Sequence, residues 1–240
     1  MIVANEFAPW LGVFETLRVI NGVPLFVLEH AAELKRAASM LGLNAELLQI
    51  KESLPRLSGR WRWLVTLKGS TSHFIEEADT PAEPLALSVS SLRLGSHNWD
   101  ARFKTMSYLS HAQALKMAAT PEVILLNEHG HVASAARANL FWRRGDRVFT
   151  PAHEAGCRCG VVRGFILQRR NVEEGHFPLD DLLAADEIFM TNSMKGIVSI
   201  KAVEDGKRDE FSCAETLRAE YARGIAEQVG ATLSYFEDAP

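Results

Sequence analysis

The sequence predicts an α/β chain made of two unequal domains. Apolar residues recur at every second position in some stretches and at spacings of three and four in others, which indicates both strands and helices. A length of 240 residues corresponds to one large or two small domains, because a domain takes about 150 residues. Periodicity is lost over residues 92–102, where Gly, Ser, Asn and Asp accumulate. We therefore expect a small domain at 1–95, a linker at 96–103 and a larger domain at 104–240.

The first part of the chain predicts several strands and two helices. The dipeptide Asn21-Gly22 is a strong signal for a two-residue β-hairpin. Apolar residues at helical spacing over residues 31–41 predict a helix, and Gly42 follows where a helix end favours glycine. Another helical stretch is expected at residues 45–54. The expected strands are residues 13–19, 24–28, 60–68 and 85–91.

The middle of the chain predicts a helix followed by an antiparallel meander. Apolar residues at helical spacing predict the helix over residues 108–119. Turn signals at residues 127–130 and 145–146 separate short apolar runs, which is typical of consecutive antiparallel strands. The runs are residues 123–126, 132–133, 140–142 and 148–150.

The last part of the chain predicts a mixed segment that ends in a long helix. A helical run at residues 164–170 follows a loop with two glycines, and two more strands are expected at 186–191 and 197–203. Ser212 and Glu215 have the spacing of a capping box, which marks a helix start. Gly230 stands where we expect this helix to end.

Composition and charge exclude several classes of protein. Basic residues number 26 against 30 acidic ones, giving a net charge of −4, and they form no cluster that suits a nucleic-acid backbone. No stretch reaches the roughly 18 consecutive apolar residues of a membrane span, and the first residues do not resemble a secretory leader. Three cysteines are too few for a disulfide framework and fit a reducing compartment. We therefore expect a soluble, cytoplasmic protein that binds neither nucleic acid nor membrane.

Several common catalytic and metal-binding patterns are missing from the sequence. Cys157 and Cys159 have no second pair of ligands at zinc spacing, and His129 and His131 stand in an expected turn. The chain also lacks the G-x-S-x-G elbow of hydrolases, the Walker phosphate loop and the dinucleotide fingerprint G-x-G-x-x-G. We therefore expect neither a metal site nor a hydrolase triad.

Two segments carry residues suited to cofactor chemistry. Gly156 and Gly160 come directly before a helical run, so backbone N–H groups there can face an anion. Lys104 follows the apolar Phe103, and a lysine shielded from water has the lowered pKa that Schiff-base chemistry needs. Taken singly, each segment has a simpler interpretation, namely an ordinary helix entry and a surface lysine.

Several segments follow one another in an order that is informative when they are taken together. They are residues 14–18, 24–41 with the leading His30, 104–108, 127–141, 150–163 and 191–197. In this order they resemble the class IV aminotransferases, which are fold-type IV enzymes that use pyridoxal 5′-phosphate. The sequence of residues 139–142 and 156–161 is most similar to the aminodeoxychorismate lyase branch of that family.

The resemblance implies a fold and a set of cofactor contacts. The implied fold has a smaller N-terminal α/β domain and a larger C-terminal domain with a mainly antiparallel, barrel-like sheet. Lys104 is implied to form the Schiff base with pyridoxal phosphate and to act as the acid–base residue. The family also implies a homodimer and a small, amino-acid-like substrate. The residues implied to contact the cofactor are Lys104, Ser134, Asn139, Gly160, Val161, Val162, Thr191, Asn192 and Ser193.

Some of these residues have narrower expected roles. Val161 and Val162 would act only through their backbone N–H groups, and Asn139 is expected to brace the loop that carries Ser134. Arg163 is expected to pair locally. Arg18 and Arg102 are candidate partners for a substrate carboxylate, because arginine can bind one with two hydrogen bonds.

Two positions depart from the family pattern at its cofactor contacts. Where the family has an arginine for the cofactor phosphate, this chain has Glu33, whose charge repels a phosphate. Lys35 and Arg36 are the nearest cations that could replace that arginine. Where the family has a glutamate that keeps the pyridine nitrogen protonated, this chain has Ser134, whose hydroxyl stabilises no positive charge there.

Three hypotheses follow from this pattern. The first is a lyase that eliminates pyruvate from aminodeoxychorismate, and Ser134 favours it, because a weaker electron sink suffices where a good leaving group departs. The second is an aminotransferase of D- or branched-chain amino acids with unusual cofactor contacts. The third is a relative that has lost catalysis and serves as a binding protein, for which Glu33 and Ser134 are the motive. The retained Lys104 argues against the third, since a buried lysine without a role costs stability.

Overall fold

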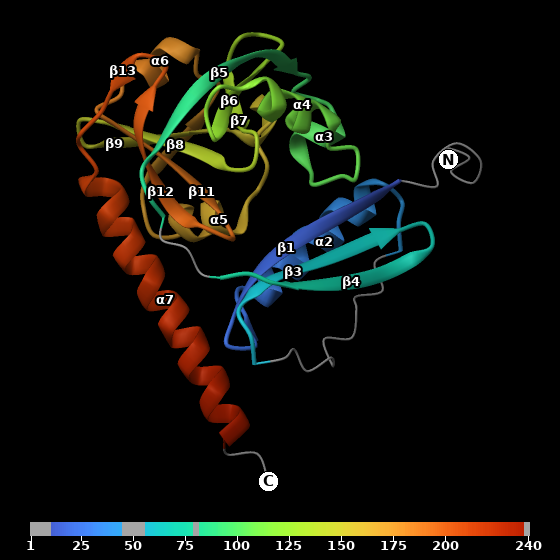
Figure 1. Cartoon of the computed structure of the whole chain (residues 1–240). Helices are drawn as coiled ribbons and strands as arrows, with labels where there is room; N and C mark the ends of the chain where they lie inside the picture. The colour runs from blue at the N-terminus through green and yellow to red at the C-terminus, as the bar shows by residue number, and fades with distance from the viewer. Residues whose placement is uncertain (1–10, 45–55, 79–81, 238–240) are drawn as a thin grey trace. The chain divides into compact units, whose positions relative to one another are not determined.

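The chain forms two compact units, shown in the computed structural model of Figure 1. The described residues are 11–44, 56–78 and 82–237. Unit 1 consists of Met1–Thr80, Lys104–Ser107 and Glu220–Pro240. Unit 2 consists of Pro81–Phe103 and Tyr108–Ala219.

This division differs from the expected domains 1–95 and 104–240. The strand β5 (Leu85–Leu94) pairs with β6 (Glu122–Asn127) and with β12 (Gly196–Val203), so it belongs to the sheet of unit 2. The expected linker at 96–103 lies in unit 2 as well. The loss of periodicity at 92–102 therefore marks a change from strand to short helix inside one unit, not a boundary between units.

Unit 1 contains an antiparallel sheet with a helix packed against it. Helix α2 (Val27–Met40) packs on β1. Buried and less buried residues alternate along β1, with Val13, Glu15 and Leu17 on its buried face, as expected of a strand covered on one side. In spatial order the described strands are β2 (Val23–Pro24), β1 (Gly12–Ile20), β3 (Gly59–Thr66) and β4 (Gly69–Glu76).

Most of the expected elements of unit 1 are present. Asn21 and Gly22 both have positive φ, 50° and 83°, which confirms the hairpin and matches the need of its turn type. Gly42 has φ 68° just after α2, as predicted for a helix end. The expected strand at 24–28 is wrong beyond its first residue, because Phe26 is left-handed and α2 begins at Val27. The helical stretch expected at 45–54 lies outside the described residues.

Unit 2 is built on a curled sheet, which in the described residues has nine strands. Five of the pairings described for this sheet are antiparallel and three are parallel, which confirms the expected mainly antiparallel sheet. Its two ends approach each other, since the end strand β7 packs near β8 and β9. In spatial order the strands are β10 (Val172–Gly175), β9 (Arg147–Pro151), β8 (Asn139–Arg144), β11 (Glu187–Asn192), β12, β5, β6 and β7 (Val132–Ala135), and β13 (Gly206–Lys207) pairs with β12.

The expected meander in the middle of the chain is only partly right. β6 pairs with β7 and β8 pairs with β9, both antiparallel, as predicted. However, β7 lies at one end of the sheet, whereas β8 lies between β9 and β11. The chain leaves β7 through a tight turn in which the Ala135 N–H donates to the Ala138 carbonyl at 2.9 Å, and β8 then finds its second ladder partner in a later strand.

Short helices surround the sheet of unit 2. Large apolar side chains, among them Trp142 and Ile188, are fully buried in its core. The helix expected at 164–170 begins three residues earlier, at Val161. The short helices of this unit are α3 (Trp99–Arg102), α4 (Leu109–Met117), η1 (His153–Ala155), α5 (Val161–Leu167) and α6 (Leu179–Leu183).

The last helix, α7 (Ser212–Glu237), continues past the expected end at Gly230. The expected capping box is also wrong. The Glu187 carboxylate accepts hydrogen bonds from the N–H groups of Cys213 (3.0 Å) and Ala214 (2.7 Å), whereas the Ser212 hydroxyl donates to Glu210 at 3.4 Å. A carboxylate is a stronger acceptor than a hydroxyl at the positive end of a helix, which explains why Glu187 caps α7 in place of Ser212. No helix among the described residues is long and apolar enough to cross a membrane.

Candidate active site

The predicted site residues fall into two groups, one in each unit. Lys104 belongs to unit 1. Ser134, Asn139, Gly160 and Thr191 belong to unit 2, with the neighbours named with them in the sequence. Each group is built differently.

Backbone pairing with β1 holds Lys104 in unit 1. The Phe14 N–H donates to the Lys104 carbonyl at 2.8 Å, and the Met106 N–H donates to the Gly12 carbonyl at 2.9 Å. Val13 and Thr105 form an antiparallel bridge between these two bonds. The segment of Lys104 therefore lies alongside β1 like a short additional strand, and its backbone position is fixed.

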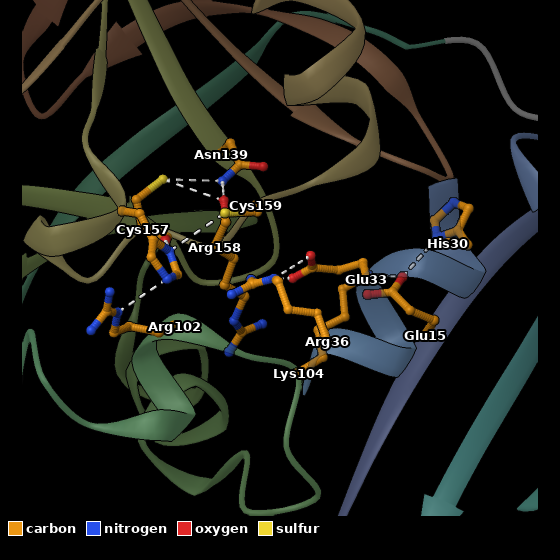
Figure 2. A network of polar contacts seen from close by, with 11 residues as sticks. Glu15, His30, Glu33, Arg36, Arg102, Lys104, Asn139, Cys157, Arg158 and Cys159 are labelled. Carbon is orange, nitrogen blue, oxygen red and sulfur yellow. Dashed lines mark hydrogen bonds and ion pairs between the residues drawn. The ribbon is translucent and has the colours of Figure 1, made fainter. Parts of the chain in front are cut away.

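A buried carboxylate holds the amine of Lys104. Lys104 Nζ lies 3.0 Å from Glu15 Oε2, and His30 Nδ1 on α2 lies 2.7 Å from the same oxygen (Figure 2). The side chain of Glu15 is 5% exposed and that of Lys104 is 26% exposed. Burial by itself raises the pKa of Glu15, but the charge of Lys104 and the hydrogen bond from His30 outweigh it and lower the pKa to about 2. Glu15 is therefore ionised at neutral pH, and the partly exposed amine of Lys104 is held beside it.

Glu15 was not among the functional residues predicted from the sequence. It stood only within residues 14–18, a segment that resembles a family. The sequence did contain an indication. Glu15 alternates with Val13 and Leu17 on the face of β1 that is buried, and a buried acid requires a partner. The identity of that partner, 89 positions along the chain, could not be read from the strand pattern.

Glu33 is neutralised within its own helix. The Arg36 guanidinium donates to both of its carboxylate oxygens, at 2.9 Å from Nε and 2.6 Å from Nη2 (Figure 2). The charge that would repel a phosphate is thus paired one turn away. Lys35, the other cation considered as a replacement, is exposed on α2.

In unit 2, two of the predicted residues lie on neighbouring strands. Asn139 and Thr191 face each other across β8 and β11. Asn139 Nδ2 lies 2.8 Å from the Arg158 carbonyl oxygen and 3.3 Å from Cys157 Sγ (Figure 2). Asn139 therefore braces the loop of residues 156–160, and the expectation that it braces the loop of Ser134 is wrong.

The same asparagine requires a glycine at position 160. A Cβ atom added to Gly160 would lie 2.1 Å from Asn139 Oδ1, closer than real Cβ atoms come. Gly160 directly precedes α5, whose first N–H groups, including those of Val161 and Val162, have no acceptor within the helix. The loop thus presents backbone donors next to a side-chain amide that fixes its course.

The turn between β11 and β12 contributes one unpaired polar group. The Thr191 hydroxyl is buried and has no hydrogen-bond partner among the described residues. Asn192 Oδ1 accepts hydrogen bonds from the N–H groups of Met194 (3.1 Å) and Lys195 (2.8 Å), which orders the turn around Ser193. A buried hydroxyl without a partner costs free energy unless a ligand or a water supplies one, so the residues present fit a phosphate group.

Ser134 lies on β7, opposite Leu125 of β6, and is 5% exposed. The turn that leads into β7 is organised by Asn127. Its side-chain oxygen accepts from the N–H groups of His129 and His131, both at 3.0 Å, and its amide donates to the Ala155 carbonyl at 3.1 Å. Asn127 therefore connects the strand pair that carries Ser134 to the segment just before the loop of residues 156–160.

The arginines considered in the sequence have other partners. Arg102 donates through Nε to His153 Nε2 at 3.2 Å, and His153 Nδ1 lies 2.7 Å from the Cys157 carbonyl oxygen. Arg18 lies close enough to Tyr221 for its charge to act on that phenol, whose pKa is nevertheless raised by burial. Arg163 is buried and pairs with Glu174, the local pairing that was expected. Among the described residues, no group of His, Cys, Asp and Glu is placed to hold a metal ion.

Comparisons with known proteins show which family the chain is similar to. Residues 12–203 match the family model for amino-transferase class IV. The chain is 30% identical over 235 residues to the aminodeoxychorismate lyase of Bacillus subtilis, covering 84% of this chain and 80% of that protein. It is 23% identical over 224 residues to the D-alanine aminotransferase of Bacillus licheniformis, covering 80% and 79%.

Solved structures show the same fold. An aminotransferase from Brucella abortus, bound to pyridoxal phosphate, superposes with a TM-score of 0.76 at 22% identity, covering 88% of this chain and 89% of that one. The two-domain fold-type IV architecture implied by the sequence is therefore confirmed.

Proposed function

Because the chain belongs to the class IV aminotransferase family of pyridoxal-phosphate enzymes, we propose that it eliminates pyruvate from aminodeoxychorismate, leaving p-aminobenzoate. The family establishes the cofactor and the general class of enzyme. The choice of reaction is the proposal, and it is supported by the 30% identity to the Bacillus subtilis lyase. The residues described above supply the chemical argument.

Pyridoxal phosphate, when bound, supplies an electron sink that stabilises negative charge at a substrate carbon. We propose that Lys104 holds it covalently. Toward its phosphate we place the backbone N–H groups of Val161 and Val162 with the hydroxyl of Thr191, supported by the unpaired state of that hydroxyl. The remaining proposed contacts come from four residues: Ser134, Asn139, Asn192 and Ser193, with Gly160 leaving room beside Asn139.

The observation that carries the proposal is the contact between Lys104 and Glu15. An amine that takes a proton from a substrate carbon becomes an ammonium ion, and a carboxylate 3.0 Å away stabilises that charge. His30 holds the carboxylate from the opposite side, at 2.7 Å. Lys104 is thereby positioned as the acid–base residue, with Glu15 and His30 as positioning residues behind it.

Ser134 supports elimination over transamination. A hydroxyl offers no negative charge to a protonated ring nitrogen, so electron withdrawal is weaker than with a carboxylate. Elimination tolerates this better, because a good leaving group departs from the neighbouring carbon.

The test is to incubate the purified protein with pyridoxal phosphate and aminodeoxychorismate, and to follow pyruvate and p-aminobenzoate together. We expect both products in equal amounts, and a loss of rate of about two orders of magnitude or more in Lys104→Ala. Lys68→Ala, which removes an exposed lysine of the same unit, serves as the matched control and should keep the wild-type rate. A protein that is fully loaded with cofactor yet releases neither product would refute the proposal.

An amino-acid aminotransferase is the second candidate, supported by the similarity to the D-alanine aminotransferase of Bacillus licheniformis. Its signature is a half-reaction. Adding D-alanine or a branched-chain amino acid to the loaded protein should then convert the cofactor to pyridoxamine phosphate, which absorbs at shorter wavelength. Rapid conversion without release of p-aminobenzoate would decide for the aminotransferase.

A further inference from the structure

Arg158 is a cation of unit 2 that the proposed function does not use. It lies in the loop of residues 156–160, where its own carbonyl accepts the hydrogen bond from Asn139. Its side chain reaches the segment of α3 and α4. Nη2 donates to the Asp100 carbonyl at 2.9 Å, and Nη1 donates to the Tyr108 hydroxyl at 3.2 Å, with the guanidinium 4.7 Å from the centre of the Tyr108 ring. These contacts fix the position of the guanidinium group.

His111 adds a third contact and no negative charge. Its Nε2 lies 3.1 Å from Arg158 Nη2, and because arginine only donates, Nε2 must be the acceptor. Burial, together with the charge of Arg158, lowers the pKa of His111 to about 3, so the ring is neutral at physiological pH. The proton then resides on Nδ1, which is buried and has no partner in the described residues.

Arg158 therefore retains its full charge and free donors. Within the described residues no carboxylate lies at ion-pair distance from it, whereas the buried Arg163 has Glu174 and Arg143 has Glu187. The three hydrogen bonds use three of the five N–H groups of a guanidinium. Of the two that remain, Nε is buried without a partner. A half-buried positive charge in a neutral surrounding is unfavourable without an anion.

We propose that Arg158 binds an oxyanion in the enzyme, either the phosphate of the cofactor or a carboxylate of the substrate. The two ligands share one chemistry, a group of negatively charged oxygens that can accept a charge-assisted hydrogen bond from the remaining Nη1 hydrogen. The stack on Tyr108 and the bonds to His111 and the Asp100 carbonyl hold the guanidinium in place before the ligand arrives, which lowers the entropy lost on binding. The assignment to an enzyme ligand rests on the proposed function, but the binding of an oxyanion does not.

The test compares Arg158→Met with Arg169→Met. Arg169 is an exposed arginine of the same unit, stacked on Phe165, so its replacement removes the same charge at a different place. Equilibrium binding of pyridoxal phosphate and of pyridoxal is followed by absorbance, and binding of benzoate to the loaded protein is followed by calorimetry. We expect Arg158→Met to weaken one of these by about ten- to hundredfold and Arg169→Met to weaken none.

The pattern of losses identifies the ligand. If Arg158 binds the phosphate, pyridoxal phosphate loses affinity in Arg158→Met and pyridoxal does not. If it binds a carboxylate, both cofactor forms bind as in the wild type and benzoate loses affinity. Unchanged binding of all three probes, or an equal loss in Arg169→Met, would overturn the inference.

Two additions keep the test decisive. If Arg158→Met does not fold, as judged by near-ultraviolet circular dichroism, Arg158→Lys replaces it. Lysine keeps the charge but cannot form the three hydrogen bonds that position the guanidinium, so affinity should still fall by about threefold or more, and wild-type affinity in that variant would contradict the proposal. If the wild type takes up no pyridoxal phosphate, the proposed function fails. Calorimetric binding of inorganic phosphate and benzoate to the cofactor-free protein and its variants then decides on Arg158 alone.

Discussion

Glu15 illustrates how a buried carboxylate can hold a side chain that lies far away in the sequence. Its carboxylate is almost fully buried on β1. Without a partner its burial would be unfavourable, because removing a charge from water costs on the order of several kcal/mol. Lys104 and His30 share one of its oxygens, so the three ionisable side chains form one cluster, in which Glu15 and His30 are buried and Lys104 is partly exposed. Removing any one of them leaves the others with an unbalanced charge or an unpaired donor.

The pH dependence of the free energy of unfolding should report on the cluster of Glu15, His30 and Lys104. The pKa of Glu15 is about 2 in the folded chain against 4.5 for a free side chain, so the unfolded state takes up the proton first as the pH falls. Glu15 therefore stabilises the fold above pH 4.5, by on the order of 3 kcal/mol, and this contribution disappears between pH 4.5 and about 2. In Glu15→Gln the fall of unfolding free energy across that range should be shallower than in the wild type, as measured by denaturant titration at each pH.

Glu29→Gln is the matched control for this measurement. Glu29 is an exposed carboxylate in the first turn of α2, the helix that carries His30. Its replacement should leave the slope of the wild type nearly unchanged. Equal slopes for the wild type and Glu15→Gln would show that the pKa of Glu15 is not lowered in the folded protein.

At the scale of single elements, the loop before α5 depends on the fit between Gly160 and Asn139. Gly160→Ala places a methyl group 2.1 Å from Asn139 Oδ1, and the amide can move only by giving up its bonds to Cys157 and to the Arg158 carbonyl. We expect the free energy of unfolding to fall by about 1–3 kcal/mol and the affinity for pyridoxal phosphate to fall with it. Denaturant unfolding and absorbance titration measure the two effects.

Gly164 provides the control for this substitution. It lies in α5, the helix that follows Gly160, and a Cβ added there meets nothing within 4 Å. Because alanine favours a helix over glycine by about 1 kcal/mol, Gly164→Ala should stabilise the protein or leave it unchanged. If Gly160→Ala behaved like Gly164→Ala, Asn139 would not be the constraint on the loop.

The start of α7 depends on an acid from another element. Glu187 on β11 is fully buried and accepts from two N–H groups of the first turn of α7. We expect Glu187→Ala to lower the free energy of unfolding by about 2 kcal/mol or more, and Ser212→Ala to change it by less than about 0.5 kcal/mol. Thermal and denaturant unfolding of both variants, with Glu187→Gln as the smaller change, checks this. If Ser212→Ala lowered the free energy of unfolding by more than about 0.5 kcal/mol, the Ser212 hydroxyl would contribute to capping the helix after all.

The elements that the sequence predicted well are those with local causes. The hairpin at Asn21-Gly22 needs only the positive φ of its two residues, and most strands of unit 2 follow from short apolar runs between turns. The strand β4 was missed, because its alternating residues are mostly polar and exposed and give no apolar period. The Glu187 cap and the contact of Glu15 with Lys104 join distant segments, and no local pattern encodes such a pairing.

At the scale of the whole molecule, the two units exchange chain segments. Lys104–Ser107 belongs to unit 1 because its backbone pairs with β1, although its neighbours on both sides belong to unit 2. The end of the chain returns to unit 1, where the Tyr221 ring stacks on Phe26 at 5.5 Å and Gln228 Oε1 accepts from the Phe26 N–H at 3.1 Å. A linear reading of domain boundaries therefore misplaced the division, since it assumes that each domain is one continuous stretch.

The division of the chain between the two units predicts which fragments fold. A fragment of residues 81–219 contains every strand described for unit 2, whereas residues 96–219 lack β5, which lies in the middle of that sheet between β12 and β6. Without β5 the sheet separates into two parts, each with an unpaired edge next to exposed apolar side chains, and such edges favour aggregation. We expect the longer fragment to unfold cooperatively on heating, with near-ultraviolet circular dichroism of an ordered core, and the shorter one to show neither. If the shorter fragment folded as well as the longer one, β5 would not be integral to unit 2, and the boundary near residue 95 would be restored; if neither folded, unit 2 would depend on the rest of the chain.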